Sequence, residues 1–253
     1  MPNPPDHRYI LGMRVDATSY EDATAQILDW AERRESRYVC VAPVQVVMTA
    51  HDSDEYREMV NSADLVTPDG MPMVWGLKIM GVDGQTRVYG PTLTEHVLRR
   101  AANRGVSVGF YGGMPEVLNN LLERTTKQFP GLKVAYSFSP PFRPLTPDED
   151  QKVVQEINRS GTRILFVGIG CPKQERWMAE HCSKINAVMI GVGAAFDFLA
   201  GAKPQAPAWM QTCGLEWLFR LGSEPKRLWR RYLYNNPRFV ALFFGQILKR
   251  FFR

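Results

Sequence analysis

The chain has 253 residues, enough to bury a full hydrophobic core as one large domain or as one domain with an appendage. Its four cysteines are scattered, with no CxxC pair and no histidine at metal-ligand spacing. This pattern argues against a structural zinc site and favours reduced thiols in a cytosolic protein. The net charge of +5 is uneven, because residues 216–253 contain nine Lys and Arg against two Glu. That tail carries +7 and the remainder carries −2, which indicates an anionic partner at the carboxyl end: a membrane, phosphates or nucleic acid.

The amino end carries no recognisable targeting signal. The first eight residues lack the basic-then-apolar order of a signal peptide, and no uninterrupted apolar run reaches the length of a membrane span. We therefore expect a protein that is made and kept in the cytoplasm.

The first third of the chain predicts a mixture of strands and helices. Residues 9–15 favour a first strand, and Ser19 with Asp22 three residues later is typical of a helix cap. The elements predicted after it are a helix to about residue 34, a strand over 38–42, helices over 44–50 and 52–61, a short strand at 65–66, a helix from about 71, and a helix over 92–103.

A repeating order then follows, in which strand, glycine turn and helix alternate. The predicted strands are 106–111, 133–137, 163–167 and 187–190, the helices are 115–128, 147–159 and one from about 172, and the glycine turns are 112–113, 168–170 and 191–193. Such alternation predicts an α/β fold with a mostly parallel sheet and helices on both faces. Ligands of such sheets bind beyond the carboxyl ends of the strands.

The glycine turns can each offer backbone N–H groups to a phosphate, although glycine is also the least strained residue at a tight turn between strand and helix. None of the three completes GxGxxG with an acidic residue at the next strand end, and the chain has no GxxxxGK[ST]. A nicotinamide dehydrogenase and a P-loop enzyme are therefore disfavoured.

Asp69 lies in a turn where a strand meets a helix. Pro68 fixes one backbone angle before it, and Gly70 after it permits conformations that a side chain would forbid. A carboxylate held in this way suits a catalytic or ligand-binding group. It also suits a simple cap for the helix that starts near Met71.

Two further groups of polar residues follow glycine turns. Lys173, Gln174 and Glu175 occupy the first turn of a helix, where they either reach the mouth of the sheet or form a solvated helix start. Phe196 and Asp197 come just after the last glycine turn, where Asp197 either binds a ligand hydroxyl or base or caps a helix.

After residue 201 the pattern changes, so we predict an α/β domain over residues 1–205 and a helical appendage over 206–253. The appendage is expected to contain one helix over 206–221, a second from 223 that breaks at 235–237, and a final helix over 238–253. The final helix bears a broad apolar stripe made of Phe239, Val240, Leu242, Phe243, Phe244, Ile247, Leu248, Phe251 and Phe252. It is too short and too basic to span a bilayer and fits a helix lying in a membrane interface. The alternative is a helix docked on the core or on another subunit.

Arg220, Arg227 and Arg230 are spaced at seven and three residues, so they can share one side of a helical pair. Three guanidinium groups on one side suit a diphosphate, and they suit lipid headgroups as well. Nucleic-acid binding is less favoured, because the aromatic residues form a helical stripe and not a platform on a sheet.

Four segments of the chain, in order, resemble the WecG/TagA/CpsF family of bacterial glycosyltransferases: 63–81 (ADLVTPDGMPMVWGLKIMG), 87–91 (RVYGP), 168–178 (GIGCPKQERWM) and 191–232. The resemblance runs from about residue 9 to 235. It implies a Rossmann-like, inverting enzyme that moves a sugar from a UDP-sugar to a polyprenyl-diphosphate-linked saccharide. It further implies no obligatory metal or other cofactor, and an appendage that meets the cytoplasmic face of the inner membrane. Residues 110–113 (FYGG) and 139–146 (SPPFRPLT) resemble the exopolysaccharide branch, which includes glucosyltransferases.

The resemblance also implies roles for particular residues. By position, Asp69 matches the general base, Arg87 and Gln174 match polar site residues, and Arg220, Arg227 and Arg230 match residues that reach the acceptor diphosphate. The remaining expected substrate contacts are Gln45, Gly70, Gly170, Lys173, Glu175, Gly193, Phe196 and Asp197. Many relatives have Thr-x-Asn where this chain has residues 41–43 (VAP), so a donor of the glucose type and one of the N-acetylmannosamine type both stay open.

Two other classes of function remain at this stage. One is a non-catalytic nucleotide-sugar-binding or scaffold protein recruited to membranes by its tail. The other is salt-sensitive nucleic-acid binding through the basic tail. Apolar residues near Trp209 and Trp217 suit either a contact in a homo-oligomer or the seat of the tail.

Overall fold

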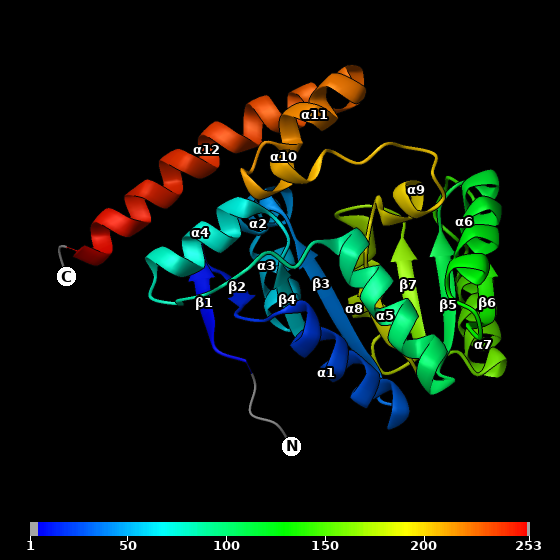
Figure 1. Cartoon of the computed structure of the whole chain (residues 1–253). Helices are drawn as coiled ribbons and strands as arrows, with labels where there is room; N and C mark the ends of the chain where they lie inside the picture. Colours follow the sequence, from blue (N-terminus) through cyan, green and yellow to red (C-terminus); the bar gives the residue numbers. More distant parts are fainter. Residues whose placement is uncertain (1–4, 252–253) are drawn as a thin grey trace.

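A six-stranded parallel sheet forms the centre of the molecule in the computed structural model, which describes residues 5–251 (Figure 1). The strand order is β4-β3-β8-β7-β5-β6. The strands are β3 (Arg37–Ala42), β4 (Leu65–Pro68), β5 (Ser107–Gly112), β6 (Lys133–Phe138), β7 (Ile164–Gly168) and β8 (Val188–Gly191). The α/β architecture predicted from the alternation of strands, glycine turns and helices is confirmed.

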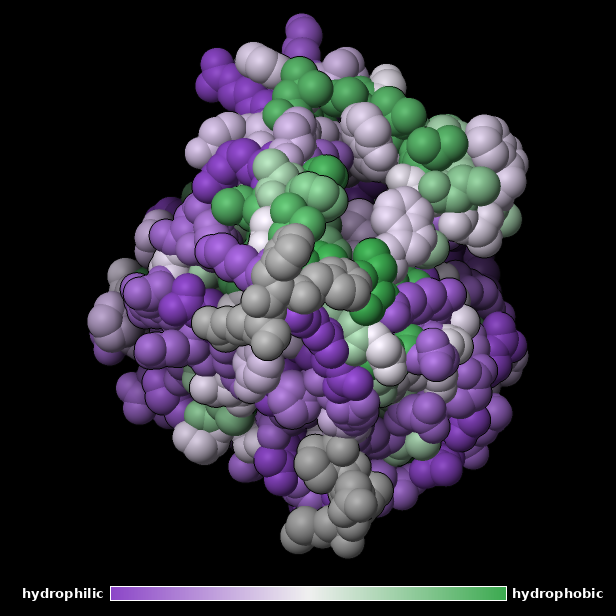
Figure 2. All heavy atoms as spheres, turned by 90° about the vertical axis from the view of Figure 1, so that its left-hand side faces the viewer, coloured by the Kyte–Doolittle hydropathy of each residue, from purple (hydrophilic) through white to green (hydrophobic). Residues whose placement is uncertain are grey.

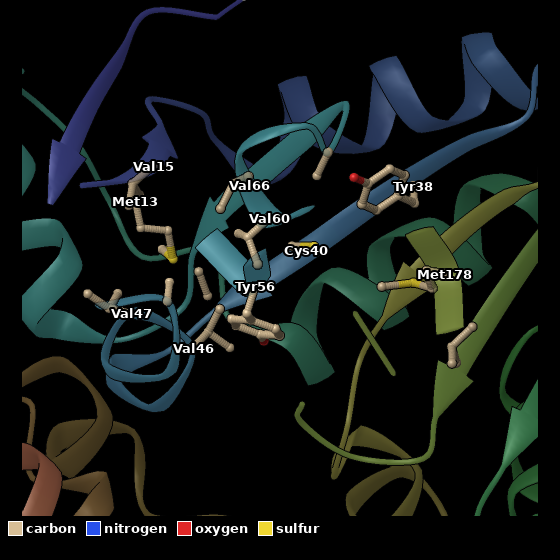
Figure 3. Close-up of a cluster of buried hydrophobic side chains, with 14 of the residues drawn as sticks. Met13, Val15, Tyr38, Cys40, Val46, Val47, Tyr56, Val60, Val66 and Met178 are labelled. Carbon is tan, nitrogen blue, oxygen red and sulfur yellow. The ribbon is translucent and has the colours of Figure 1, made fainter. Parts of the chain in front are cut away.

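Helices cover both faces of this sheet, because its strands are apolar on both sides. In β3, Tyr38, Cys40 and Ala42 enter one core, whereas Val39 and Val41 enter the other. Figure 3 shows Tyr38 and Cys40 in the first core with side chains from α2, α3 and α8. The helices on this face are α2 (Val44–Asp52), α3 (Asp54–Asn61), α7 (Pro147–Ser160) and α8 (Lys173–His181). Those on the other are α1 (Tyr20–Glu32), α5 (Gly90–Arg104), α6 (Pro115–Gln128) and α9 (Ala195–Leu199).

The amino end differs from the single strand predicted over 9–15. It forms an antiparallel hairpin, β1 (His7–Ile10) and β2 (Met13–Asp16), outside the main sheet. Leu11 and Gly12 turn the chain with φ of 50° and 85°. The prediction was wrong because only Gly12 is a typical turn residue, and Leu11 occupies the left-handed region despite its side chain. The predicted cap at Ser19 is confirmed, since its hydroxyl accepts a hydrogen bond from the backbone N–H of Asp22 at 3.1 Å.

The tail also differs from the prediction. The single helix expected over 206–221 is two helices, α10 (Ala208–Thr212) and α11 (Glu216–Ser223). Gly214, at a φ of 74°, lies between them so close to Trp75 of α4 (Met71–Ile79) that a Cβ atom would come within 2.9 Å of the indole ring. Glycine is thus needed there both for its backbone angle and for space.

The break expected at 235–237 is absent, because α12 (Pro225–Phe251) continues through Pro237. A proline inside a helix removes one hydrogen bond, but contacts on both sides hold this helix in place. Arg238 forms an ion pair with Asp52 at 2.7 Å, and Phe239 and Phe243 are buried in the core. The side-chain amide of Gln246 bonds to the β1–β2 hairpin. Figure 1 shows α12 above the side of the sheet that holds β3 and β4 and extending past that side.

The apolar stripe predicted on the final helix is therefore divided between two sides of α12. Phe239 and Phe243 are 4% and 9% exposed, whereas Val240 and Phe244 are 65% and 63% exposed. Of the other predicted members, the side chain of Phe251 and all of Phe252 lie outside the described part of the chain. Among residues 5–251, no helix has the length and apolar character needed to cross a membrane.

Candidate active site

Two adjoining cavities lie at the carboxyl ends of β3, β4 and β8, beneath the tail helices. Their volumes are about 720 Å³ and about 200 Å³. The two cavities share the lining residues Pro43, Gln45, Asp69, Arg220 and Arg231. The site thus lies at the edge of the sheet where the alternating pattern predicts a ligand.

The two cavities differ in character. The larger lies between α4 and the tail, and its lining includes the apolar side chains of Met71, Trp75, Leu215, Trp217, Tyr232, Leu233, Phe239 and Val240. The smaller is lined by the glycine turns after β7 and β8, by Gln174, and by Arg220, Arg227 and Arg231. An apolar chamber therefore adjoins a chamber that combines backbone turns with three guanidinium groups.

Asp69 follows β4 directly and lies on the wall that the two cavities share. It does not cap α4, because Gly70 is the N-cap residue and no side-chain cap bond is present. Gly70 does not use the conformational freedom that the sequence analysis noted, since its φ of −88° and ψ of 145° are open to any residue. Gly70 instead contributes to the lining of the larger cavity.

Arg87 joins Asp69 to the tail. Its Nε donates to the backbone oxygen of Asp69, its Nη2 lies 3.2 Å from Asp69 Oδ1, and its Nη1 lies 2.7 Å from Glu216 Oε2 in α11. The guanidinium carbon also lies 4.1 Å from the ring centre of Tyr89, within range of a cation–π contact. Every nitrogen of Arg87 is thereby engaged, and two acidic side chains meet at one cation.

The pKa of Asp69 is raised above its ordinary value. Burial is the largest cause, because it penalises the charged form, and the negative charge of Glu216 adds to it. Arg87 and Arg220 oppose the shift. The resulting carboxylate is a stronger base than one in water.

Gln174 holds the glycine turn after β8. Its Oε1 accepts from the backbone N–H of Gly193 at 3.1 Å, and its Nε2 donates to Glu175 Oε1 at 2.8 Å. Glu175 is fully buried behind Gln174 and lines neither cavity, and burial raises the pKa of its carboxyl group. Gln174 thus lines the smaller cavity and fixes its floor.

A family model described as the glycosyl transferase WecG/TagA/CpsF family matches residues 8–253. The chain belongs to this family. A relative from Bacillus spizizenii, N-acetylglucosaminyldiphosphoundecaprenol N-acetyl-beta-D-mannosaminyltransferase, is 29% identical over 213 residues, which are 84% of this chain and 80% of the relative. The resemblance to the exopolysaccharide branch stays a prediction.

In this member of the glycosyltransferase family, several residues predicted from the sequence meet at the cavities. They are Gln45, Asp69, Gly70, Arg87, Gly170, Gln174, Gly193, Arg220 and Arg227. Gly170 and Gly193 have φ of 85° and 53°. They therefore adopt left-handed conformations that favour glycine, as expected of tight turns.

Other predicted residues lie elsewhere. Lys173 is exposed and lines neither cavity, because α8 directs Gln174 and Glu175 inward. Phe196 is a core residue whose ring centre lies 5.7 Å from that of Phe110. Asp197 pairs with Lys203 at 2.8 Å and lines neither cavity.

Arg230 is exposed, and its guanidinium lies over Trp229. Arg231 occupies the cavity wall in its place, four residues after Arg227 on the same face of α12. Burial lowers the pKa of Arg231, and the nearby charges of Arg220 and Arg227 lower it further. The sequence reasoning missed Arg231 and Glu216. Arg231 could have been found from its helical spacing of four residues from Arg227. Glu216 could have been found as the only acidic residue in the segment 214–221 (GLEWLFRL).

Metal-ligand side chains are not clustered in the part of the chain that the structure describes. Within residues 5–251, no three His, Cys, Asp or Glu side chains lie close enough together to hold a metal ion.

Proposed function

We propose that the chain transfers a hexose from a UDP-sugar to a polyprenyl-diphosphate-linked saccharide in cell-surface polysaccharide synthesis. The main observation behind this proposal is the position of Asp69 on the wall shared by an apolar chamber and a chamber rich in glycine turns and arginine. A reaction that joins a lipid-linked acceptor to a nucleotide-bound sugar needs a base between two such spaces. The relative's name specifies a diphosphoundecaprenol-linked acceptor, which supports the proposal.

In this proposal, UDP-sugar occupies the smaller cavity and the acceptor enters through the larger one. Arg220 and Arg231 line both cavities, so their guanidinium groups contact the diphosphate of the UDP-sugar where the two cavities meet. Arg227 contacts the same diphosphate in the smaller cavity. A bound anion would also relieve the mutual repulsion of these three cations, which lowers the pKa of Arg231.

The chemistry is a single displacement. An acceptor hydroxyl gives its proton to Asp69 while its oxygen forms a bond to C1 of the donor sugar. The bond from C1 to the diphosphate oxygen breaks, and its electron pair leaves with UDP. Because the nucleophile enters opposite the leaving group, the configuration at C1 inverts. The arginine side chains stabilise the charge that develops on UDP, so the step needs no metal ion.

We further propose that the tail rests on the cytoplasmic face of the inner membrane. Exposed apolar side chains gather on α4 and α12, namely Trp75, Ile79, Val240, Phe244 and Leu248. Figure 2 shows hydrophobic side chains clustered in the upper half of the face toward which α4 and the end of α12 point, above a mainly hydrophilic lower half. An apolar surface beside basic residues suits an interfacial helix.

The test is release of UDP, measured with UDP-glucose, UDP-N-acetylmannosamine and its uronate, each with and without a polyprenyl-diphosphate saccharide. We expect release from one donor to depend on the acceptor. Pro43 and Gln45 line both cavities in the region where many relatives have Thr-x-Asn. The donor that is used therefore shows whether the loss of the Thr-x-Asn pattern goes with a different donor sugar. Donor binding without acceptor-dependent release would instead support the non-catalytic scaffold.

A further inference from the structure

Glu216 is an acidic residue from the tail that reaches the base assigned to the α/β core. It occupies the first turn of α11, and its side chain is 11% exposed. Its Oε2 lies 2.7 Å from Arg87 Nη1, closer than the 3.2 Å that separates Arg87 Nη2 from Asp69 Oδ1. The contact with Glu216 is an ion pair without hydrogen-bond geometry, whereas Asp69 Oδ1 accepts a hydrogen bond, so the cation is shared between the tail and the carboxylate of Asp69.

The sharing of Arg87 between two carboxylates matters because an arginine beside a single carboxylate frequently forms two parallel hydrogen bonds with it. Such a pair would place both oxygens of Asp69 against a cation and weaken it as a proton acceptor. In the structure, one nitrogen of Arg87 donates to the Asp69 backbone oxygen and another forms an ion pair with Glu216. Asp69 Oδ1 receives the remaining contact from Arg87, and no hydrogen bond to Oδ2 is found among residues 5–251.

We propose that Glu216 is a positioning residue that draws the Arg87 guanidinium toward the tail, so that Arg87 orients Asp69 without neutralising it. The proposal rests on the function proposed above. Because Glu216 belongs to α11, the base reaches full strength only when the tail is docked beside the cavities. Attachment of the tail and the basicity of Asp69 are thereby coupled.

The surroundings of Asp69 support this role. The charged and titratable groups that face it are Arg87 and Tyr89 before α5, Tyr20 of α1, and Glu216 and Arg220 of the tail. Glu216 is the acidic member of this set, and its charge raises the pKa of Asp69, whereas the two arginines lower it. Removal of the Glu216 charge therefore leaves burial alone to oppose the effect of the two cations on the pKa of Asp69.

The direct test is to follow the carbon-13 NMR signals of labelled Asp carboxyl groups in the full chain as the pH is changed. The signal of Asp69 is identified as the one that is missing in Asp69→Asn. We expect the pKa of Asp69 to fall by about one unit in Glu216→Gln, the lower end of what a newly closed arginine contact causes. Glu216→Asp keeps the charge and should hold the pKa closer to that of the wild type. Arg238→Gln breaks another tail-to-core ion pair, with Asp52, and should leave the pKa of Asp69 unchanged.

The kinetic counterpart is the pH profile of kcat. In Glu216→Gln the maximal rate should fall on the order of tenfold while the acid limb moves to lower pH, because the base is weaker but loses its proton earlier. An unmoved pKa of Asp69 in Glu216→Gln, or a Glu216→Asp variant that matches it, would overturn the proposal. The titration needs no turnover, so this failure is distinct from that of the proposed function, which is marked by the absence of acceptor-dependent UDP release.

Discussion

The two walls of the site are built differently. On the sheet side, Glu175, Gln174 and Gly193 form a chain of hydrogen bonds within two adjacent strand-to-helix units, and no tail residue takes part in it. On the tail side, Asp69 and Glu216 approach each other only through Arg87, which joins segments more than a hundred residues apart in the chain. The comparison indicates that the floor of the smaller cavity is set by the sheet itself, whereas the strength of the base depends on a docked appendage.

The largest effect should come from the residue where the two walls meet. We expect Asp69→Asn to lower kcat between about a hundredfold and ten-thousandfold, the range for a lost general base, while binding of UDP-sugar stays intact. Turnover is measured as UDP release, and donor binding by calorimetry. Asp83→Asn, an exposed change outside both cavities, is the matched control. Near-normal turnover in Asp69→Asn would remove Asp69 from the role of base.

Adjacent phenylalanines on α12 separate the tail's contact with the core from its exposed face. Phe243→Ala should cost about 3 kcal/mol of unfolding free energy, because the buried ring leaves a cavity. Phe244→Ala should change stability by less than about 0.5 kcal/mol, since its side chain is 63% exposed. Denaturant unfolding measures both.

The exposed member of this pair, Phe244, also tests the membrane proposal. Sedimentation with anionic vesicles should be weakened by Phe244→Ala, because that ring lies on the exposed apolar face of α12. Equal vesicle binding by the wild type and by a variant in which Val240, Phe244 and Leu248 are all changed to Ser would show that this face does not contact lipid.

Glu175 tests the sheet side through pH. Burial raises the pKa of Glu175 in the folded protein above the value near 4.5 that it has in the unfolded chain. Its contribution to stability is therefore complete below the unfolded-state pKa and is lost as the pH rises through the folded-state pKa. Glu175→Gln stays neutral and should gain stability relative to the wild type as the pH rises from about 4.5 toward the folded pKa of Glu175, by at most about 1.4 kcal/mol per pH unit. Glu180→Gln, on the exposed side of α8, is the control. A stability difference that does not vary with pH would show that Glu175 is ionised in the folded protein.

The smallest effect concerns metal ions. We expect EDTA to leave the rate of UDP release unchanged, because the proposed step places the charge of the leaving group on arginine side chains. A rate that falls in EDTA and recovers with added Mg²⁺ or Mn²⁺ would contradict this prediction.

Local patterns were sufficient for much of the sheet side. The helix predicted over 115–128 has those bounds as α6, and the strand predicted over 38–42 begins one residue earlier as β3. Gln174 and Gly193 could be placed near one another because the carboxyl ends of parallel strands share one edge. Asp69 could be placed at that edge too, but nothing local distinguishes a catalytic carboxylate from a helix cap.

The sequence by itself determined the alternation of strand, turn and helix, since periodicity and glycine turns act over a few residues. Only the tertiary structure decided that α12 passes through Pro237, because Asp52 and the core hold the helix on either side of it. It likewise turned Phe196 into the core, exposed Arg230 and brought Glu216 to Arg87. Those outcomes depend on how distant segments pack, and packing between distant segments leaves no periodic signal in the chain.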